Sequence, residues 1–315
     1  GKCITGDTII WPNKGLMEIK ELPRYYFVDS KSHQVFGAGL SSFQIDDIVS
    51  EDQFASHWFD LGEQKTIKIR SSQGFSLEGT PEHPVVVMGA DGKLKFRRLD
   101  QIEVNDYIAI QSGRKAFGNL KIVNEDTAYL LGLLTGDGNL SHSSHVGLTS
   151  IDQPIISFYR GYLEKYHPEA KIYLDSKKQS YLVSNWDFKR KLYQMGMSYL
   201  LSYDKVIPPT ILQAPETVQV AFLQGLFDTD ASITKNRAEF EYTTVSERMA
   251  RQVQIMLLNL GVVASLNIKG RKENGYYRSV YRINLTGSSL VSFSRAVGFR
   301  LSRKQNLLQS HIKKM

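Results

Sequence analysis

Two segments of this chain share a pattern that ends in an aspartate. They are Leu130–Gly138, which reads Leu-Leu-Gly-Leu-Leu-Thr-Gly-Asp-Gly, and Leu223–Ala231, which reads Leu-Gln-Gly-Leu-Phe-Asp-Thr-Asp-Ala. Each holds two small residues four positions apart, namely Gly132 and Gly136, and Gly225 and Thr229. Residues four apart share one face of a helix, and small residues there let two helix backbones approach closely. Such packing would bring the acids Asp137 and Asp230 together at one end of the seam.

Two crowded carboxylates repel each other unless a positive charge lies between them. A divalent cation with oxygen ligands meets that need, and we expect Mg²⁺ here, with Mn²⁺ as a substitute. Held against a DNA backbone, such ions activate water and stabilise the leaving oxygen of a phosphodiester. One motif alone would fit an ordinary amphipathic helix that ends in Asp. Two copies in phase, 93 residues apart, favour a metal-dependent nuclease centre at Asp137 and Asp230.

The sequence around the motifs repeats with the same period. Helices are expected to start at Asn124, where a capping residue precedes two acids, and at Pro215. Each motif leads into strand-like residues, an amphipathic helix, a strand pair and a further helix. The predicted middle helices and strand pairs are Gln153–Tyr166 with Lys171–Val183, and Ser246–Leu260 with Ser265–Leu285. This pattern predicts an α+β domain of two pseudo-symmetric αββαββα halves, about residues 119–213 and 214–315, in a monomer.

Residues 1–112 are expected to form an all-β domain, because short apolar or alternating runs recur between turn signals. These runs are Thr8–Trp11, Gln34–Phe36, Thr66–Ile69, Pro84–Met88 and Tyr107–Ile110. The charge changes sign at the polar segment 112–119. Residues 1–112 hold 12 Lys and Arg against 16 Asp and Glu, whereas residues 113–315 hold 27 against 16. A basic second domain indicates nucleic-acid binding there, although a basic solvated surface would give the same balance.

The composition excludes other classes. No run of about 18 apolar residues could span a membrane, and the 42% hydrophobic residues are ample for folded cores. A single cysteine rules out an internal disulfide framework and fits a reducing compartment. We therefore expect an intracellular protein, cytoplasmic or, in a eukaryote, nuclear.

Over about residues 119–315, with both motifs, the chain resembles the LAGLIDADG homing endonucleases. The resemblance implies that Asp137 and Asp230 are the metal-binding catalytic acids. The sixth motif position, Thr135 in one copy and Asp228 in the other, is variable in that family. Ala231 stands where the family has a final glycine.

The resemblance also implies a lysine beside each catalytic centre. Lys205 matches the family's first lysine, in the segment Lys-Val-Ile-Pro. Symmetry predicts Lys304 for the second half, with Arg300 and Arg303 as rivals. Such a lysine would polarise the scissile phosphate or help to activate water. A single lysine without this context would be a solvated surface charge.

DNA recognition is assigned to the predicted strands, where long polar residues alternate. A two-stranded ribbon fits the major groove, where Arg and Lys read guanine edges or hold phosphates. The candidates are Lys171, Tyr173, Lys177 and Lys178 in the first half, and Lys269, Arg271, Lys272, Arg278 and Arg282 in the second. Because these sets differ, the double-stranded DNA target is expected to be asymmetric.

The first domain, residues 3–112, resembles the Hint fold of inteins and hedgehog-type autoprocessing proteins. The resemblance rests on Cys3, on the segment Gly79–Val86 with its Thr-x-x-His element, and on Leu99–Tyr107. It implies that the Cys3 thiol attacks the Lys2 carbonyl and converts the amide to a thioester. His83 would protonate the departing amide nitrogen, and Thr80 would hold the strained peptide or its oxyanion.

Inteins end in a His-Asn pair after closing β segments, whereas this chain ends in Ser310–Met315. We therefore expect that it does not complete splicing alone. A split intein that acts in trans with a complementary C-terminal fragment, a truncation and a degenerate element all stay open. The expected partners are double-stranded DNA and the flanks of a host protein (exteins). The alternative to a nuclease is a LAGLIDADG protein that binds DNA without cutting it.

Overall fold

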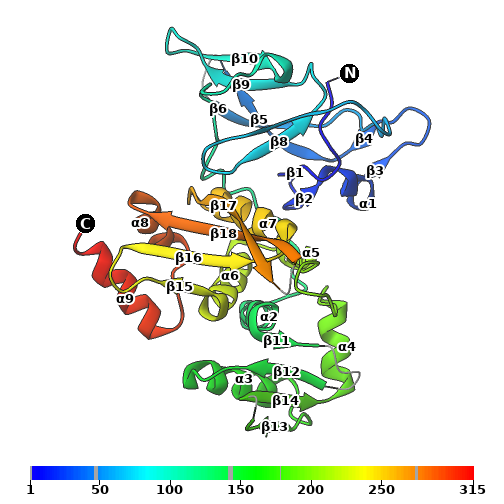
Figure 1. The fold of residues 1–315 in the computed structure, drawn as a ribbon. Helices are drawn as coiled ribbons and strands as arrows, with labels where there is room; N and C mark the ends of the chain where they lie inside the picture. Colours follow the sequence, from blue (N-terminus) through cyan, green and yellow to red (C-terminus); the bar gives the residue numbers. More distant parts are fainter. Residues whose placement is uncertain (1, 46–48, 141–144, 178, 274–275) are drawn as a thin grey trace.

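Small antiparallel sheets make up the first domain (Figure 1). The computed structural model describes residues 2–45, 49–140, 145–177, 179–273 and 276–315. The strands pair as β1 (Ile9–Ile10) with β2 (Met17–Glu18), β3 (Phe27–Val28) with β4 (Val35–Phe36), β5 (Gly39–Gln44) with β6 (Val49–Phe54), β7 (Ile67–Arg70) with β8 (Ser76–Gly79), and β9 (Pro84–Met88) with β10 (Leu94–Arg98). Short helical turns interrupt them at η1 (Ile19–Glu21), α1 (Leu22–Tyr25) and η2 (Leu99–Gln101).

One predicted strand of this domain is shorter than expected. Within Tyr107–Ile110, only Ile108 forms a β-bridge, opposite Val87. The segment still pairs with β9, because the amide of Ala109 donates to the Val86 carbonyl at 2.9 Å. The prediction of a full strand over Tyr107–Ile110 is therefore wrong.

The second domain consists of two halves with the same order of elements. The first half contains α2 (Glu125–Asp137), β11 (Gly138–Asn139), β12 (His145–Thr149), α3 (Gln153–Tyr166), β13 (Ile172–Asp175), β14 (Ser180–Ser184), α4 (Trp186–Gln194) and the short α5 (Pro209–Leu212). The second half contains α6 (Glu216–Asp230), β15 (Ala231–Ile233), β16 (Glu239–Thr244), α7 (Glu247–Asn259), β17 (Ser265–Glu273), β18 (Tyr276–Thr286), α8 (Ser288–Ala296) and α9 (Ser302–Ile312). The sheet orders, β11-β12-β14-β13 and β15-β16-β18-β17, correspond strand for strand. The predicted αββαββα repeat is confirmed.

Local sequence signals explain where these helices start. The side chain of Asn124 accepts from the Thr127 amide at 2.9 Å and caps α2. Ser246 caps α7 in the same way, accepting from the Met249 amide at 3.1 Å. Each bond satisfies an amide that the first turn of a helix would otherwise leave unpaired.

A continuous apolar core joins the two halves, with α2 and α6 side by side at its centre and a sheet on either side (Figure 1). It extends to Leu16 of the first domain, which is 1% exposed. A smaller cluster lies in the first domain itself. It consists of Met17, Leu22, Tyr26, Val35 and Ala38. In the part of the chain that the structure describes, no helix is long and apolar enough to cross a membrane.

The first domain docks on α7 and on the edge strand β17. The amide of Leu266 donates to the Gln73 carbonyl at 2.9 Å, and Arg248 pairs with the buried Glu18 at 2.5 Å. At Gly74, where φ is +82°, a Cβ would lie 2.1 Å from the Leu266 carbonyl oxygen. This close approach accounts for glycine at position 74. The boundary at residue 112 stays a prediction.

Candidate active site

Helices α2 and α6 touch backbone to backbone. A Cβ on Gly132 would lie 2.2 Å from the carbonyl oxygen of Phe222. On the other helix, a Cβ on Gly225 would lie 2.2 Å from the carbonyl oxygen of Tyr129. Both distances are far inside van der Waals contact, so only glycine at these two positions permits this seam.

The seam ends at the two predicted acids. Asp137 is the last residue of α2 and Asp230 the last of α6, and both are solvent-exposed. A Cβ on Gly136 would lie 3.2 Å from Asp230 Cγ and 2.1 Å from Thr229 Oγ1. The small residues thus allow the carboxyl groups to approach each other.

The electrostatics of the pair fit a cation site. Although Asp230 reaches solvent, partial desolvation by the surrounding protein raises its pKa to about 6, and the charge of Asp137 adds to the rise. Desolvation also raises the pKa of Asp137, while Lys205 and Lys304 lower the pKa of both acids. A hard divalent cation favours carboxylate oxygens as ligands, and between these two acids it would also relieve their mutual repulsion. Within the described ranges, no cluster of three or more His, Cys, Asp or Glu residues could hold a metal ion.

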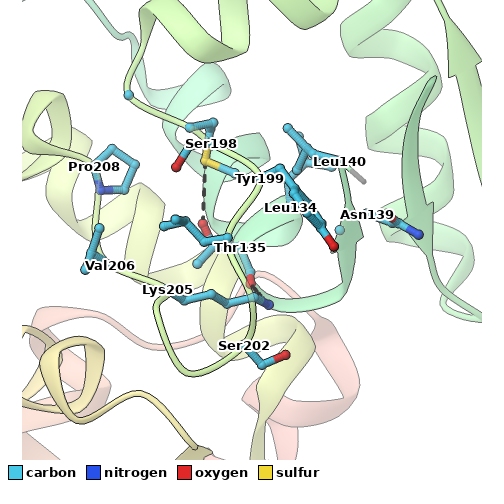
Figure 2. Close-up of a pocket in the computed structure, with 14 residues that line it drawn as sticks. Leu134, Thr135, Asn139, Leu140, Ser198, Tyr199, Ser202, Lys205, Val206 and Pro208 are labelled. Carbon is cyan, nitrogen blue, oxygen red and sulfur yellow. Dashed lines mark hydrogen bonds between the residues drawn. The ribbon is translucent and has the colours of Figure 1, made fainter. Parts of the chain in front are cut away.

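Lys205 lies at the C-terminal end of α2 (Figure 2). Its ammonium donates to the carbonyl oxygens of Thr135 at 2.6 Å and Gly136 at 3.2 Å. A cation at this end of a helix is stabilised by the unpaired carbonyl groups of the last turn. The Lys205 ammonium is therefore bound to the two residues that immediately precede Asp137.

A cavity of about 150 Å³ opens beside Lys205. Figure 2 shows it between α2 and the loop that carries Lys205, with Thr135 and Tyr199 on its wall. The Thr135 hydroxyl donates back to the carbonyl of Leu131 at 2.7 Å and lies 3.8 Å from Met197 Sδ. At this motif position the side chain of the first half thus contacts its own helix and Met197, but not the ammonium of Lys205.

Lys304 occupies the corresponding place at the end of α6. Its ammonium donates to the carbonyl oxygens of Phe227, Asp228 and Ala231, at 2.8, 2.7 and 2.6 Å. The side chain is 7% exposed, and burial lowers its pKa to about 8. The arrangement mirrors that of Lys205.

The two rival arginines point to other partners. Arg300 donates to Gln224 at 2.9 Å, and Arg303 forms a two-bond ion pair with Asp152 at 2.9 and 2.8 Å. Neither of these contacts involves the helix end that Lys304 occupies. The position of Lys304 at the end of α6 therefore agrees with its choice, over Arg300 and Arg303, from the symmetry of the two halves.

The structure adds contacts around the lysines that the sequence did not reveal. The segment of Lys205 is held by α7 of the other half, because Ser246 Oγ donates to the Lys205 carbonyl at 2.6 Å and Gln252 accepts from the Ile207 amide at 2.8 Å. Asp228 is 1% exposed and hydrogen-bonds to Tyr129 Oη at 2.7 Å. In the sequence, Asp228 could have been noticed as an acid on an apolar helix face. No local pattern indicated the roles of Ser246 and Gln252.

In the first-half sheet, the predicted DNA-contacting residues lie at the outer strand β13. Tyr173 is 54% exposed and alternates with Ile172, whose partner Val183 is fully buried. Lys171 and Lys177 are exposed and flank the strand. Lys178 lies outside the described residues.

In the second-half sheet, register separates the candidates. Lys269 is exposed, and Arg282 pairs with Glu241 at 3.1 Å. Arg271 stands opposite Arg278, in phase with Lys269 and Arg282, whereas Lys272 stands opposite Tyr277 in the other phase. Successive strand residues alternate between faces. The side chains of Arg271, Lys272 and Arg278 lie outside the described part of the structure.

The three residues predicted in the first domain come together around one peptide bond. The Cys3 amide donates to Thr80 Oγ1 at 3.0 Å, and the Thr80 amide donates to the Cys3 carbonyl at 2.9 Å. Burial lowers the pKa of His83, whose side chain lies against the Lys2 backbone. Thr80 is thus at the amide nitrogen and His83 beside the preceding residue, and a cavity of about 860 Å³ opens at Cys3.

A family model described as a LAGLIDADG-like domain matches residues 124–203 and 217–298, more than half of the chain. This chain belongs to the LAGLIDADG-like domain family. The two matched stretches correspond to the two halves and contain Asp137 and Asp230.

Curated relatives of this LAGLIDADG-like chain carry the names of different proteins. The replication factor C small subunit of Methanocaldococcus jannaschii is 29% identical over 99% of this chain and 17% of the relative. A DNA gyrase subunit of Mycobacterium leprae is 26% identical over 81% of this chain and 20% of the relative. The chain thus spans about a fifth of the length of these relatives. A similar solved structure is I-DmoI in complex with DNA and Ca, 19% identical with a TM-score of 0.45, covering 59% of this chain and 98% of that chain.

Proposed function

We propose that this protein is a site-specific, metal-dependent DNA endonuclease of the homing type. The observation that carries the proposal is the seam of α2 and α6, which ends in Asp137 and Asp230 with Lys205 and Lys304 beside them. Each half of one chain contributes one acid and one lysine. A single chain therefore holds two centres and suffices to cut both strands as a monomer.

Asp137 and Asp230 would hold the metal, and their mutual repulsion fits a divalent cation such as Mg²⁺ or Mn²⁺. Besides these two carboxylates, the remaining ligands would be backbone oxygens, water and DNA phosphate. When bound, the cation supplies an activated water and stabilises the leaving oxygen. Lys205 and Lys304 would stabilise negative charge on the scissile phosphate, because each ammonium is held next to one acid.

The sheets would bind double-stranded DNA. Lys269 on the second sheet, and Lys171, Tyr173 and Lys177 on or beside β13 of the first, are exposed, and Arg282 lies between the buried Tyr281 and Ile283. Such side chains can hold phosphates or read base edges in the major groove. The two sheets carry different side chains, and this supports an asymmetric target.

For the first domain we propose Hint-type splicing chemistry at Cys3. The thiol sulfur would attack the Lys2 carbonyl carbon; the thioester C–S bond forms, and the Lys2–Cys3 C–N bond breaks. His83, whose pKa is lowered by burial, would take the thiol proton and deliver it to the departing nitrogen. Thr80 would orient that nitrogen through its 3.0 Å hydrogen bond.

The relatives support an inserted element. A replication factor subunit and a gyrase subunit have different names, yet each matches 81–99% of this chain over about a fifth of its own length. A mobile segment shared by unrelated hosts gives this pattern. The partners would then be host-protein flanks (exteins) and, in a split intein, a complementary C-terminal fragment.

The test is cleavage of a randomised duplex DNA library with Mg²⁺. Wild-type protein is expected to cut one target in both strands, and Asp137→Asn/Asp230→Asn is expected to bind that target without cutting it. Asp126→Asn/Glu216→Gln is the matched control, since these acids lie in the first turns of the same helices. Selective binding without cutting by the wild type would favour the alternative, a DNA-binding protein that lacks cleavage.

A further inference from the structure

The two lysine segments are held in different ways, and Asp228 accounts for the difference. Asp228 occupies the sixth motif position of α6, where α2 has Thr135. Its carboxylate is buried and accepts from Tyr129 Oη at 2.7 Å, across the seam. It also accepts from the Leu301 amide, at 3.3 Å through one oxygen and 3.2 Å through the other.

Leu301 immediately precedes α9, and its side chain provides no hydrogen bond that caps the helix. Lys304 lies one turn later, and its amide donates to the Leu301 carbonyl at 3.0 Å. The Lys304 ammonium then returns to the Asp228 carbonyl oxygen at 2.7 Å. Asp228 therefore contacts both ends of the segment, through its side chain at Leu301 and through its backbone at Lys304.

The first half lacks this arrangement. The Thr135 hydroxyl donates to the Leu131 carbonyl in its own helix and to Met197 Sδ in the segment before Lys205, and the contact with Lys205 itself comes from the Thr135 carbonyl. The polar contacts described above for the Lys205 segment come from Ser246 and Gln252 instead. The acid at position 228 thus serves only one of the two centres.

We infer that Asp228 is a positioning residue for Lys304 and thereby controls cleavage of one DNA strand but not the other. The inference rests on the proposed nuclease function. A misplacement of about 1 Å at a reacting group costs on the order of 100-fold in rate. Loosening the Leu301 segment should therefore slow one strand strongly, while the centre at Lys205 keeps its own supports.

The experiment measures nicking of each strand of the recovered target, end-labelled separately. Lys304→Ala and Lys205→Ala identify the strand that depends on each lysine. Asp228→Asn is expected to slow the Lys304-dependent strand about tenfold and the other strand less than about twofold. Tyr129→Phe, which removes one hydroxyl, should slow the same strand to a smaller extent. Thr127→Val is the control for general destabilisation, because it removes a buried hydrogen bond to Tyr162 away from the site.

A second measurement does not need cleavage. Reductive methylation with formaldehyde, read by mass spectrometry, compares Lys304 with Lys205. In wild type, Lys304 is expected to be protected, and Asp228→Asn should remove that protection without changing Lys205. Equal slowing of both strands, no slowing, or unchanged methylation of Lys304 would each overturn the inference. If the wild type cuts no DNA, the proposed nuclease fails, and methylation alone still decides the positioning role.

Discussion

The substitution Gly132→Ala tests whether the helix seam determines both stability and the site. In isolation, alanine stabilises a helix interior by about 1 kcal/mol relative to glycine. At this position, however, the new Cβ would lie 2.2 Å from the Phe222 carbonyl oxygen and 2.8 Å from the Leu226 amide nitrogen. Both are backbone atoms of α6, so rotation of a side chain cannot relieve the clash.

The helices would have to separate by about 1 Å to restore normal contact, and overpacking of this kind costs about 1–3 kcal/mol, occasionally more. The overpacking exceeds the gain in helix propensity, and we expect a net loss of about 2 kcal/mol in the free energy of unfolding. Because the seam also sets the approach of Asp137 and Asp230, DNA cleavage should fall on the order of 10–100-fold.

Chemical denaturation followed by circular dichroism measures the first effect, and cleavage of the recovered target measures the second. The matched control is Gly161→Ala in α3, where a Cβ would meet no atom within 4 Å. That variant should be more stable than wild type by up to about 1 kcal/mol. A Gly132→Ala protein as stable as Gly161→Ala would refute the account of the seam.

The same geometry leads to three further expectations. The folded-state pKa of Asp230, about 6, lies above its ordinary value of 3.8, so between these pH values the folded protein binds more protons than the unfolded chain and loses stability as pH rises through 6. In EDTA, Asp230→Asn should therefore raise the unfolding temperature at pH 8 but not at pH 4. Equal shifts at both pH values would contradict the assignment. When a host flank is fused before Gly1, added thiol should release that flank by cleavage after Lys2. Thr80→Ala should slow the release about tenfold, and Cys3→Ala should abolish it. Release from the Cys3→Ala protein would eliminate Cys3 as the nucleophile. If Lys269 contacts a phosphate, Lys269→Ala should reduce the slope of log DNA affinity against log salt concentration by about 0.9. The control Lys31→Ala, on the first domain, should leave that slope unchanged. An identical slope for both variants would remove Lys269 from the DNA surface.

The local elements of the second domain could be read from the sequence alone. The predicted helix Gln153–Tyr166 matches α3 residue for residue, and Asn124 and Ser246 are the caps of α2 and α7. These features depend on side chains within one or two turns of each other, so the linear pattern contains them. The four-residue spacing of Gly132 and Gly136, and of Gly225 and Thr229, likewise predicted a close seam, because residues four apart share one face of a helix.

Long-range positions were decided by the tertiary structure. Lys304, Arg300 and Arg303 lie within five residues of one another, and only the path of the chain into α9 puts the lysine at the end of α6. Asp228 gained its contact with Leu301 because α9 returns to α6 across 73 residues. Hydrogen bonds across such separations depend on how loops close and helices pack, and no local periodicity encodes them. The sequence therefore determined the elements and the two acids, and the packing of the two halves determined which side chains surround them.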